Sequence, residues 1–226
     1  MIEDVAFPLK ELPEATADLQ ELLVTNEYHD ACIYGHALEG NFHFIISQSF
    51  DSPEQVARYE KLMDEVKTLV VDKYDGSLKA EHGTGRNMAP FVKYEWGERA
   101  YGFMKAVKEL FDPKGLLNPG VIFNEDPHCH LKHFKPMPLT NAHVDKCIEC
   151  GFCEVNCLTC GFSLSSRQRI VIQREISRLK KLSDTESSER LKTLQKQYKY
   201  LGNATCAGDG LCSMSCPMGI NVGDLT

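Results

Sequence analysis

Four cysteines in one short run constrain this chain more than any other feature. They stand at positions 147, 150, 153 and 157, in the spacing C-x2-C-x2-C-x3-C. Three thiolates this close together in one loop can bind three irons of a cubane cluster, while the fourth points elsewhere. A second run from Cys206 to Cys216 keeps this spacing, with Asp209 where its second cysteine would stand. The two runs predict two iron–sulfur clusters and therefore electron transfer.

The spacing also predicts how the two runs share their ligands. In two-cluster proteins with such runs, the fourth cysteine of a run ligates the other cluster. The first cluster is therefore expected to use Cys147, Cys150, Cys153 and Cys216. The second is expected to use Cys157, Cys206 and Cys212, with either Asp209 or Cys160 as the remaining ligand. Asp209 could hold a labile fourth iron of a 4Fe-4S cluster or leave a 3Fe-4S cluster.

Two other uses of the cysteines agree less well with their spacing. A structural zinc site usually takes its ligands as two separated pairs. Disulfide frameworks are typical of small secreted proteins, whereas here eight of the ten cysteines lie between positions 147 and 216. A zinc-stabilised interaction protein is the alternative, and it predicts a colourless preparation with stoichiometric zinc.

Composition indicates a globular protein of one large or two small domains. The chain has 226 residues, 42% of them hydrophobic, and a net charge of −7, which argues against nucleic acid as a partner. No apolar stretch approaches the ~20 residues of a transmembrane helix, and the start lacks a signal-peptide pattern. Reduced cysteines suggest a cytoplasmic protein, either free or peripheral at the inner membrane.

Local patterns divide the chain into three parts. Residues 1–124 mix helix and strand patterns, residues 125–139 contain three prolines and suggest a linker, and residues 140–226 hold both cysteine runs. We expect an α+β class: a cap domain with an antiparallel sheet, followed by an all-helical ferredoxin-like domain.

Periodicity and end signals predict the individual elements. In the first domain we expect helices over 12–25, from 53 to about 74 and from about 94 to 111, a hairpin of strands 31–37 and 41–48, and a short strand 77–81. In the second we expect a helix from Ser165 or Ser166 and a charged helix over about 185–200. The basic residues of the first of these helices suggest a solvated face, with a docking surface as the alternative; they are Arg167, Arg169, Arg174, Arg178, Lys180 and Lys181.

A second group of chemically active residues lies in the first domain. His36 and His43 are seven residues apart, and a turn at Glu39 would let their imidazoles converge from adjacent strands. Glu81 and His82 add a carboxylate and a further imidazole in a glycine-rich loop. Two histidines and a carboxylate suit Zn or another first-row divalent ion such as Mn, with positions left open for substrate.

Several segments of the chain resemble a known family. The segments GHALEGNFH, AEHGTGR and FDPKGLLNPG resemble the C-terminal domain of FAD-linked oxidases of the vanillyl-alcohol oxidase superfamily, in particular D-lactate and D-2-hydroxyglutarate dehydrogenases. DKCIECGFCEVNC and SSRQRIV resemble the iron–sulfur domain fused behind that module in bacterial D-2-hydroxyacid dehydrogenases related to glycolate oxidase subunits. The similarity covers nearly the whole chain.

The resemblance implies roles for several residues. The divalent metal would be held near the flavin by His36, His43 and Glu81. His82 matches the candidate general base, and Asn118 matches an asparagine that contacts the flavin. Arg86 is open to two interpretations, a partner for the substrate carboxylate or a surface ion pair. Ile45 departs from relatives that have an asparagine at this position.

The implied function is oxidation of a D-2-hydroxy acid, namely lactate, 2-hydroxyglutarate or glycolate, to the 2-oxo acid via FAD. Two clusters would relay electrons to an external acceptor. The FAD-binding domain of the family is expected to precede residue 1, which makes this chain a fragment or one subunit of a split enzyme. The alternative is an electron-transfer subunit without a catalytic site of its own.

Overall fold

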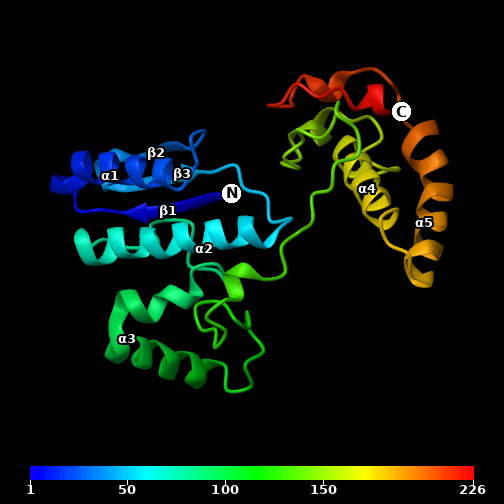
Figure 1. Ribbon diagram of the computed structural model, residues 1–226. Coiled ribbons are helices and arrows are strands. Elements are labelled where there is room, and N and C mark those ends of the chain that lie inside the picture. The colour runs from blue at the N-terminus through cyan, green and yellow to red at the C-terminus, as the bar shows by residue number, and fades with distance from the viewer. The chain divides into compact units, whose positions relative to one another are not determined.

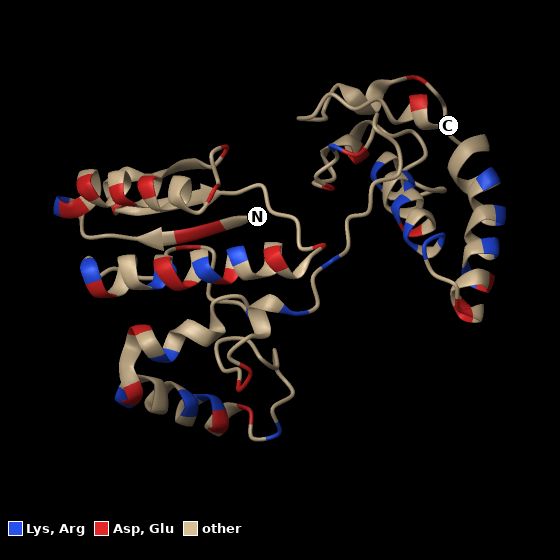
Figure 2. Cartoon of the chain, viewed as in Figure 1, with Lys and Arg blue, Asp and Glu red and all other residues tan.

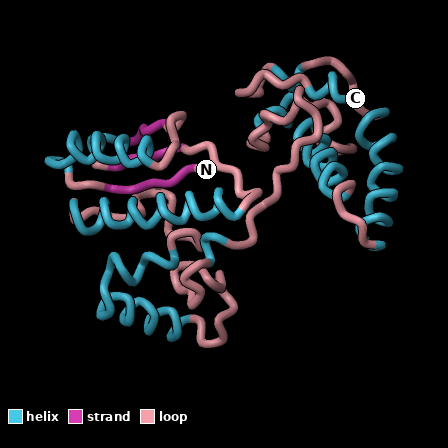
Figure 3. Tube along the Cα trace, in the orientation of Figure 1, coloured by secondary structure: helices cyan, strands magenta, loops and turns pink.

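The computed structural model describes residues 1–226, which form two compact units, 1–135 and 136–226. Figure 1 shows the regular elements of unit 1, which are β1 (Ile2–Ala6), α1 (Leu12–Thr25), β2 (Cys32–His36), β3 (Asn41–Ile45), α2 (Pro53–Lys67) and α3 (Ala89–Phe111). Unit 2 has α4 (Ser166–Leu179) and α5 (Thr185–Tyr198), and Figure 3 shows long loops around them. None of these helices has both the length and the apolar character needed to cross a membrane.

The sheet of unit 1 is small and antiparallel, with strand order β1-β3-β2. Its register pairs His43 with Asp4 of β1 on one side and with Tyr34 of β2 on the other. Because side chains alternate across a strand, these three residues point to one face of the sheet. The opposite face carries Val5 and Phe44, which are both buried. The predicted α+β class with an antiparallel sheet is confirmed for this unit.

The core of unit 1 lies between that second face and the apolar stripes of α1 and α2. Its fully buried members include Leu19, Leu23, Phe44, Tyr59, Leu62 and Val66. Burial of each such side chain stabilises the fold by about 1.5–3 kcal/mol before entropy is counted. The core leaves the face with His43 free to serve as a site.

The hairpin predicted from the sequence forms between β2 and β3. A short 3-10 turn, Ala37–Glu39, and Gly40 connect the strands. Gly40 has φ of +69°, and a Cβ there would lie 2.2 Å from the carbonyl oxygen of Phe7. Only glycine allows this close approach. The tight turn places His36, at the end of β2, near His43 in β3.

The predicted strand 77–81 does not form, which corrects the sequence analysis. Ser77 and Ala6 exchange two backbone hydrogen bonds as an isolated bridge. Beyond it the backbone N–H groups donate to side-chain carboxylates: that of Leu78 to Glu95, and those of residues 80–82 to Asp4. With these donors satisfied by side chains, the segment has no need of a strand partner.

Helix starts agree with the sequence, except in α3. The helix predicted from 53 to about 74 forms as α2 and a π-helix, Thr68–Lys73, that continues it. Ser52 caps α2 by accepting from the N–H of Gln55 at 3.4 Å. The helix α3 begins at Ala89 rather than near Tyr94, because Pro90 presets its first turn. Gly97, with φ of 72° and ψ of 166°, then breaks it into two parts.

Residues just beyond 124 pack within unit 1. His130 is buried, with its ring 5.1 Å from that of Phe91. Phe134 stacks on Phe50 at 3.7 Å between ring centroids. The domain limits 1–124, 125–139 and 140–226 stay a prediction.

Unit 2 is built around a small core. Ser165 and Gln168 form a capping box at the start of α4. The buried core residues are Val144, Ile170, Cys212, Ile220 and Val222, and three further cysteines pack against them. So small a core usually needs a metal or covalent staple. The ferredoxin-like fold of this unit stays a prediction.

The basic residues of α4 do not form one solvated face. Figure 2 shows Lys and Arg along α4 and α5, but Arg169 and Arg174 are only 1% and 4% exposed. Arg169 directly precedes Ile170 and Arg174 lies about one turn beyond it, and all three are buried. The prediction of a solvated face was wrong for these two arginines, because they donate to the loops that carry the cysteines.

Candidate functional site

Three of the predicted ligands converge on the open face of the sheet in unit 1. Oε1 of Glu81 lies 3.1 Å from Nε2 of His36 and 2.8 Å from Nε2 of His43. Their ligand atoms all lie within 4.8 Å of one another. Tetrahedral Zn–N distances of about 2.0–2.1 Å place ligand atoms a little over 3 Å apart, so the donor set fits one divalent ion.

The ligands differ in how firmly they are held. His43 is buried in the middle strand, whereas His36 and Glu81 are exposed. The Nδ1 of His43 is buried without a hydrogen-bond partner, so packing against Tyr34 and His82 fixes its ring.

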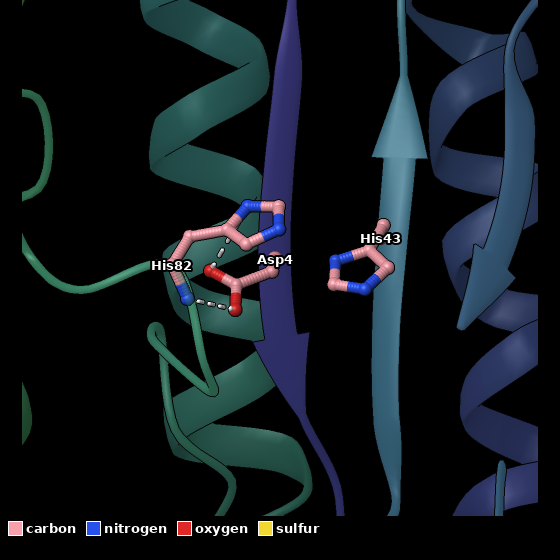
Figure 4. Close-up of side chains that lie close together, drawn as sticks. All are labelled: Asp4, His43 and His82. Atoms are coloured by element: carbon pink, nitrogen blue, oxygen red, sulfur yellow. Dashed lines mark hydrogen bonds and ion pairs between the residues drawn. The ribbon is translucent and has the colours of Figure 1, made fainter. Parts of the chain in front are cut away.

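His82 covers His43 from the neighbouring loop. The two rings stack with centroids 4.5 Å apart and planes 7° from parallel. Nδ1 of His82 lies 4.0 Å from Oδ1 of Asp4. Figure 4 shows these three side chains together, from β1, β3 and the loop after residue 79. The predicted base therefore adjoins the predicted ligands.

Asp4 organises this loop and was missed by the sequence analysis. Its Oδ2 accepts the N–H groups of Ala80 (3.2 Å), Glu81 (2.6 Å) and His82 (3.0 Å), and Oδ1 accepts from Nζ of Lys79 at 3.3 Å. Burial favours a higher pKa for Asp4, but the two amides of His82 and Glu81 and the Lys79 charge outweigh it and lower the pKa. The ionised carboxylate thus holds both Glu81 and His82 in place.

We expect Asp4→Asn to destabilise the protein by about 3 kcal/mol near neutral pH, because charge-assisted hydrogen bonds to a buried group are lost. Since the pKa of Asp4 is lowered in the folded state, its stabilisation is present above the unfolded value of 3.8 and is lost as pH falls through the folded value. Urea unfolding at pH 7 and at a series of pH values below 3.8 measures this. Wild type and variant should differ at pH 7 and converge in acid.

The matched control is Asp30→Asn, which changes an exposed aspartate and should leave stability within about 0.5 kcal/mol. A variant at Asp4 that unfolds like wild type at pH 7 would contradict the role given to this carboxylate.

Arg86 and Asn118 lie on two loops that are joined to each other. Nε of Arg86 donates to the carbonyl of Pro119 at 3.3 Å, and the N–H of Ile122 donates to that of Gly85 at 3.1 Å. Both side chains are exposed, and Asn118 has a φ of 44°. None of these bonds ties the two residues to the histidines, so their predicted roles stay predictions.

In unit 2 the cysteines surround two separate hollows. One is lined by Cys147, Cys150, Cys153 and Cys216, together with Glu149, Arg167 and apolar residues. The residues lining the other include Cys157, Cys206, Cys212 and Asp209. Cys160 is absent from the lining of both. Each hollow is thus lined by residues from both runs, and Asp209 but not Cys160 lines the second. The ligand assignments stay predictions.

The surroundings of the sulfurs suit iron–sulfur clusters. The backbone N–H of Glu149 donates to Sγ of Cys147 and that of Val222 to Sγ of Cys212, both at 3.3 Å. Thiolates of a tetrahedral zinc site lie about 3.8 Å apart, given Zn–S bonds of about 2.3 Å. The groups of three potential ligands within 4.8 Å of one another both lie in unit 1.

The thiols of the two hollows differ in their electrostatics. Burial raises the pKa of Cys147 and Cys153 in the first. At Cys157 of the second, burial has the same tendency, but hydrogen bonds from Thr159 and backbone amides outweigh it and lower the pKa.

Comparison with known proteins agrees with this geometry. Residues 1–122 match the family model for the C-terminal domain of FAD linked oxidases, and residues 143–220 match that for a 4Fe-4S dicluster domain. The chain is 33% identical over 124 residues to D-2-hydroxyglutarate dehydrogenase of Stutzerimonas stutzeri, covering 53% of this chain and 26% of the relative. It is 27% identical over 126 residues to glycolate oxidase subunit GlcD of Bacillus subtilis, covering 56% and 26%.

A third relative is the mitochondrial D-lactate dehydrogenase [cytochrome] 1 of Saccharomyces cerevisiae, 30% identical over 125 residues, or 55% of this chain and 21% of the relative. The matched part thus spans about a quarter of the length of these relatives. Its family model covers more than half of the present chain. The chain therefore belongs to the FAD-linked oxidases, through their C-terminal domain, and carries a 4Fe-4S dicluster domain behind it.

Proposed function

We propose that this chain supplies the substrate half and the electron relay of an FAD-dependent D-2-hydroxyacid dehydrogenase. An FAD-binding domain or subunit would supply the rest. The proposal rests mainly on one observation: His36, His43 and Glu81 converge on the open sheet face beside His82. The cysteine-lined hollows of unit 2 give the electrons a path onward.

Each group of residues has a defined task in this proposal. When bound, the divalent ion supplies Lewis acidity, the flavin accepts a hydride, and the clusters carry single electrons. His36, His43 and Glu81 hold the ion, which is Zn or Mn by the chemistry of its ligands. Asp4 fixes the loop that carries Glu81.

His82 takes the proton of the substrate hydroxyl. Stacking on His43 limits how its ring can turn, and an imidazole nitrogen held within hydrogen-bond reach of a hydroxyl can accept its proton. Arg86 pairs with the substrate carboxylate, and Asn118 contacts the flavin. Both side chains are exposed on their loops, where a second domain can reach them.

The clusters are held across the two runs. The first uses Cys147, Cys150, Cys153 and Cys216. The second uses Cys157, Cys206, Cys212 and Asp209. An oxygen ligand releases iron more readily than a thiolate, because soft thiolates suit iron–sulfur clusters better. The second cluster therefore loses one iron first and becomes 3Fe-4S on exposure to air.

The substrate is a D-2-hydroxy acid of the size of lactate, 2-hydroxyglutarate or glycolate, in keeping with the names of the relatives. The clusters deliver electrons to an acceptor outside this chain. We place the protein in the cytoplasm or at the inner face of the inner membrane, where its thiols stay reduced.

The test is metal and sulfide analysis with visible spectroscopy of the protein purified without oxygen. We expect a brown protein with roughly eight irons for two clusters and one further divalent ion per chain. Combined with the FAD-binding partner, it should reduce a dye when one of the three D-acids is added.

Two results would each contradict part of the proposal. A colourless protein with stoichiometric zinc in unit 2 would replace the clusters by a structural zinc site. A brown protein without the extra ion, whose His82 can be replaced at no cost in turnover, would be an electron-transfer subunit with no catalytic site of its own.

A further inference from the structure

Arg169 on α4 places a buried positive charge beside the second cysteine-lined hollow. The side chain is 1% exposed, and the residue itself lines that hollow. Its guanidinium donates to the carbonyls of Gly202 (2.6 Å) and Leu164, to the hydroxyls of Thr159 (3.2 Å) and Thr205 (3.1 Å), and to Sγ of Cys157 (3.9 Å).

Every one of these partners is a neutral oxygen or a thiol sulfur. A buried charge is normally paired with an opposite charge, because desolvation is costly. Arg174, five residues further along α4, follows that rule beside the first hollow. Its Nη1 lies 2.6 Å from Oε1 of Glu149, and Nη2 donates to the carbonyl of Cys147 at 2.9 Å. Arg167, which lines the first hollow, lies 3.2 Å from Glu154. Both arginines beside the first hollow are thus paired with carboxylates, whereas Arg169 beside the second is not.

The position of Arg169 suggests where its counter-charge comes from. It contacts Sγ of Cys157 directly, and through Thr205 it adjoins Cys206, the next residue in the chain. Both cysteines line the second hollow. Thiolates and the cluster they hold carry net negative charge, and the potential of a cluster depends on nearby charge and on hydrogen bonds to its sulfurs.

We propose that Arg169 raises the reduction potential of the second cluster above that of the first, so that an electron shared between the two clusters rests on the second. A nearby positive charge stabilises the reduced cluster, which is the more negative of its two states. At the first cluster the carboxylates of Glu149 and Glu154 oppose the same effect of Arg174 and Arg167. Arg169 does not bind the cluster itself. It acts on the cluster through the cysteine ligands and is therefore a positioning residue. The inference rests on the proposed function, since it requires both clusters to be present.

Potentiometric titration followed by EPR, on the full chain purified without oxygen, tests the proposal. We expect Arg169→Gln to shift the electron equilibrium between the clusters at least tenfold toward the first, which is 59 mV for one electron. The potential of the first cluster should stay unchanged. Arg169→Lys keeps the charge and should retain most of the wild-type difference. Arg178→Gln, which changes a partly exposed arginine paired with Glu175, is the control and should shift neither cluster.

A second pair of variants covers the case in which Arg169→Gln fails to assemble its second cluster. Thr205→Asp gives the guanidinium a carboxylate partner like Glu149, and Thr205→Asn is its uncharged match. The aspartate should lower the potential of the second cluster relative to the asparagine.

The proposal is overturned if both clusters assemble and neither Arg169→Gln nor Thr205→Asp changes the potential of the second. Absence of iron and sulfide from the wild-type chain would instead refute the proposed function. The two failures are therefore distinguishable.

Discussion

Replacing His82 by Asn in the complete enzyme, with its FAD-binding partner, should lower turnover by about two to four orders of magnitude while the divalent ion stays bound. This is the usual contribution of a positioned general base. The ion should remain because Glu81, His36 and His43 approach one another without His82. Steady-state rates with the best D-2-hydroxy acid, together with metal analysis of the same preparation, measure both effects.

The variant His43→Asn tests the divalent-ion site, whereas His82→Asn tests the general base. His43 is the one buried ligand of the three, and it lies 2.8 Å from Glu81. Its loss should remove both the ion and nearly all turnover, while the absorbance of the clusters in unit 2 stays. His29→Asn changes an exposed histidine and should alter neither the rate nor the metal content.

The predictions for these two variants would be contradicted by different results. A near-normal rate for His82→Asn would exclude it as the base, even if the ion is present. Unchanged metal content in His43→Asn would exclude the ion site and leave the histidines a structural role. Measuring the ion in the isolated chain separates these outcomes from any fault in assembly with the FAD-binding partner.

Much of the site in unit 1 could be predicted because it depends on local features of the chain. The turn around Gly40 and the alternation of the strands suffice to bring His36 and His43 together. The register then gives the same face to Asp4, His43 and Tyr34. Such short-range patterns are strong in a sequence.

Asp4 could not be predicted, because its role depends on contacts with a segment more than seventy residues away. The carboxylate replaces a strand partner for residues 80–82, so the alternating pattern there predicted a strand that does not form. Tertiary hydrogen bonds outweighed local propensity. No feature of the first strand distinguishes Asp4 from an ordinary surface aspartate.

Arg169 and Arg174 left a signal that the sequence analysis did not use. Arg169 directly precedes the apolar Ile170, Arg174 lies about one turn beyond it, and all three are buried. A charged residue on the apolar stripe of an amphipathic helix indicates a buried partner. Charge alone suggested solvent, whereas charge and position together indicate the cysteine loops.

The grouping of cysteines across the two runs makes the other prediction of large effect. Cys157→Ala should remove the second cluster and roughly half of the iron, since two clusters hold four irons each. The spectrum of the first should remain. Cys216→Ala should do the reverse, although Cys216 stands in the run that supplies most of the second hollow.

The comparison that decides this prediction pairs variants from different runs. The EPR spectrum of Cys157→Ala should match that of Cys206→Ala, and the spectrum of Cys216→Ala should match that of Cys147→Ala. If each run instead held its own cluster, Cys157→Ala would resemble Cys147→Ala. Cys160→Ala serves as the control, because Cys160 lines neither hollow and its loss should leave all the iron in place.

Because each cluster would take ligands from both runs, the two clusters would tie the ends of unit 2 together, which explains how so small an apolar core can suffice.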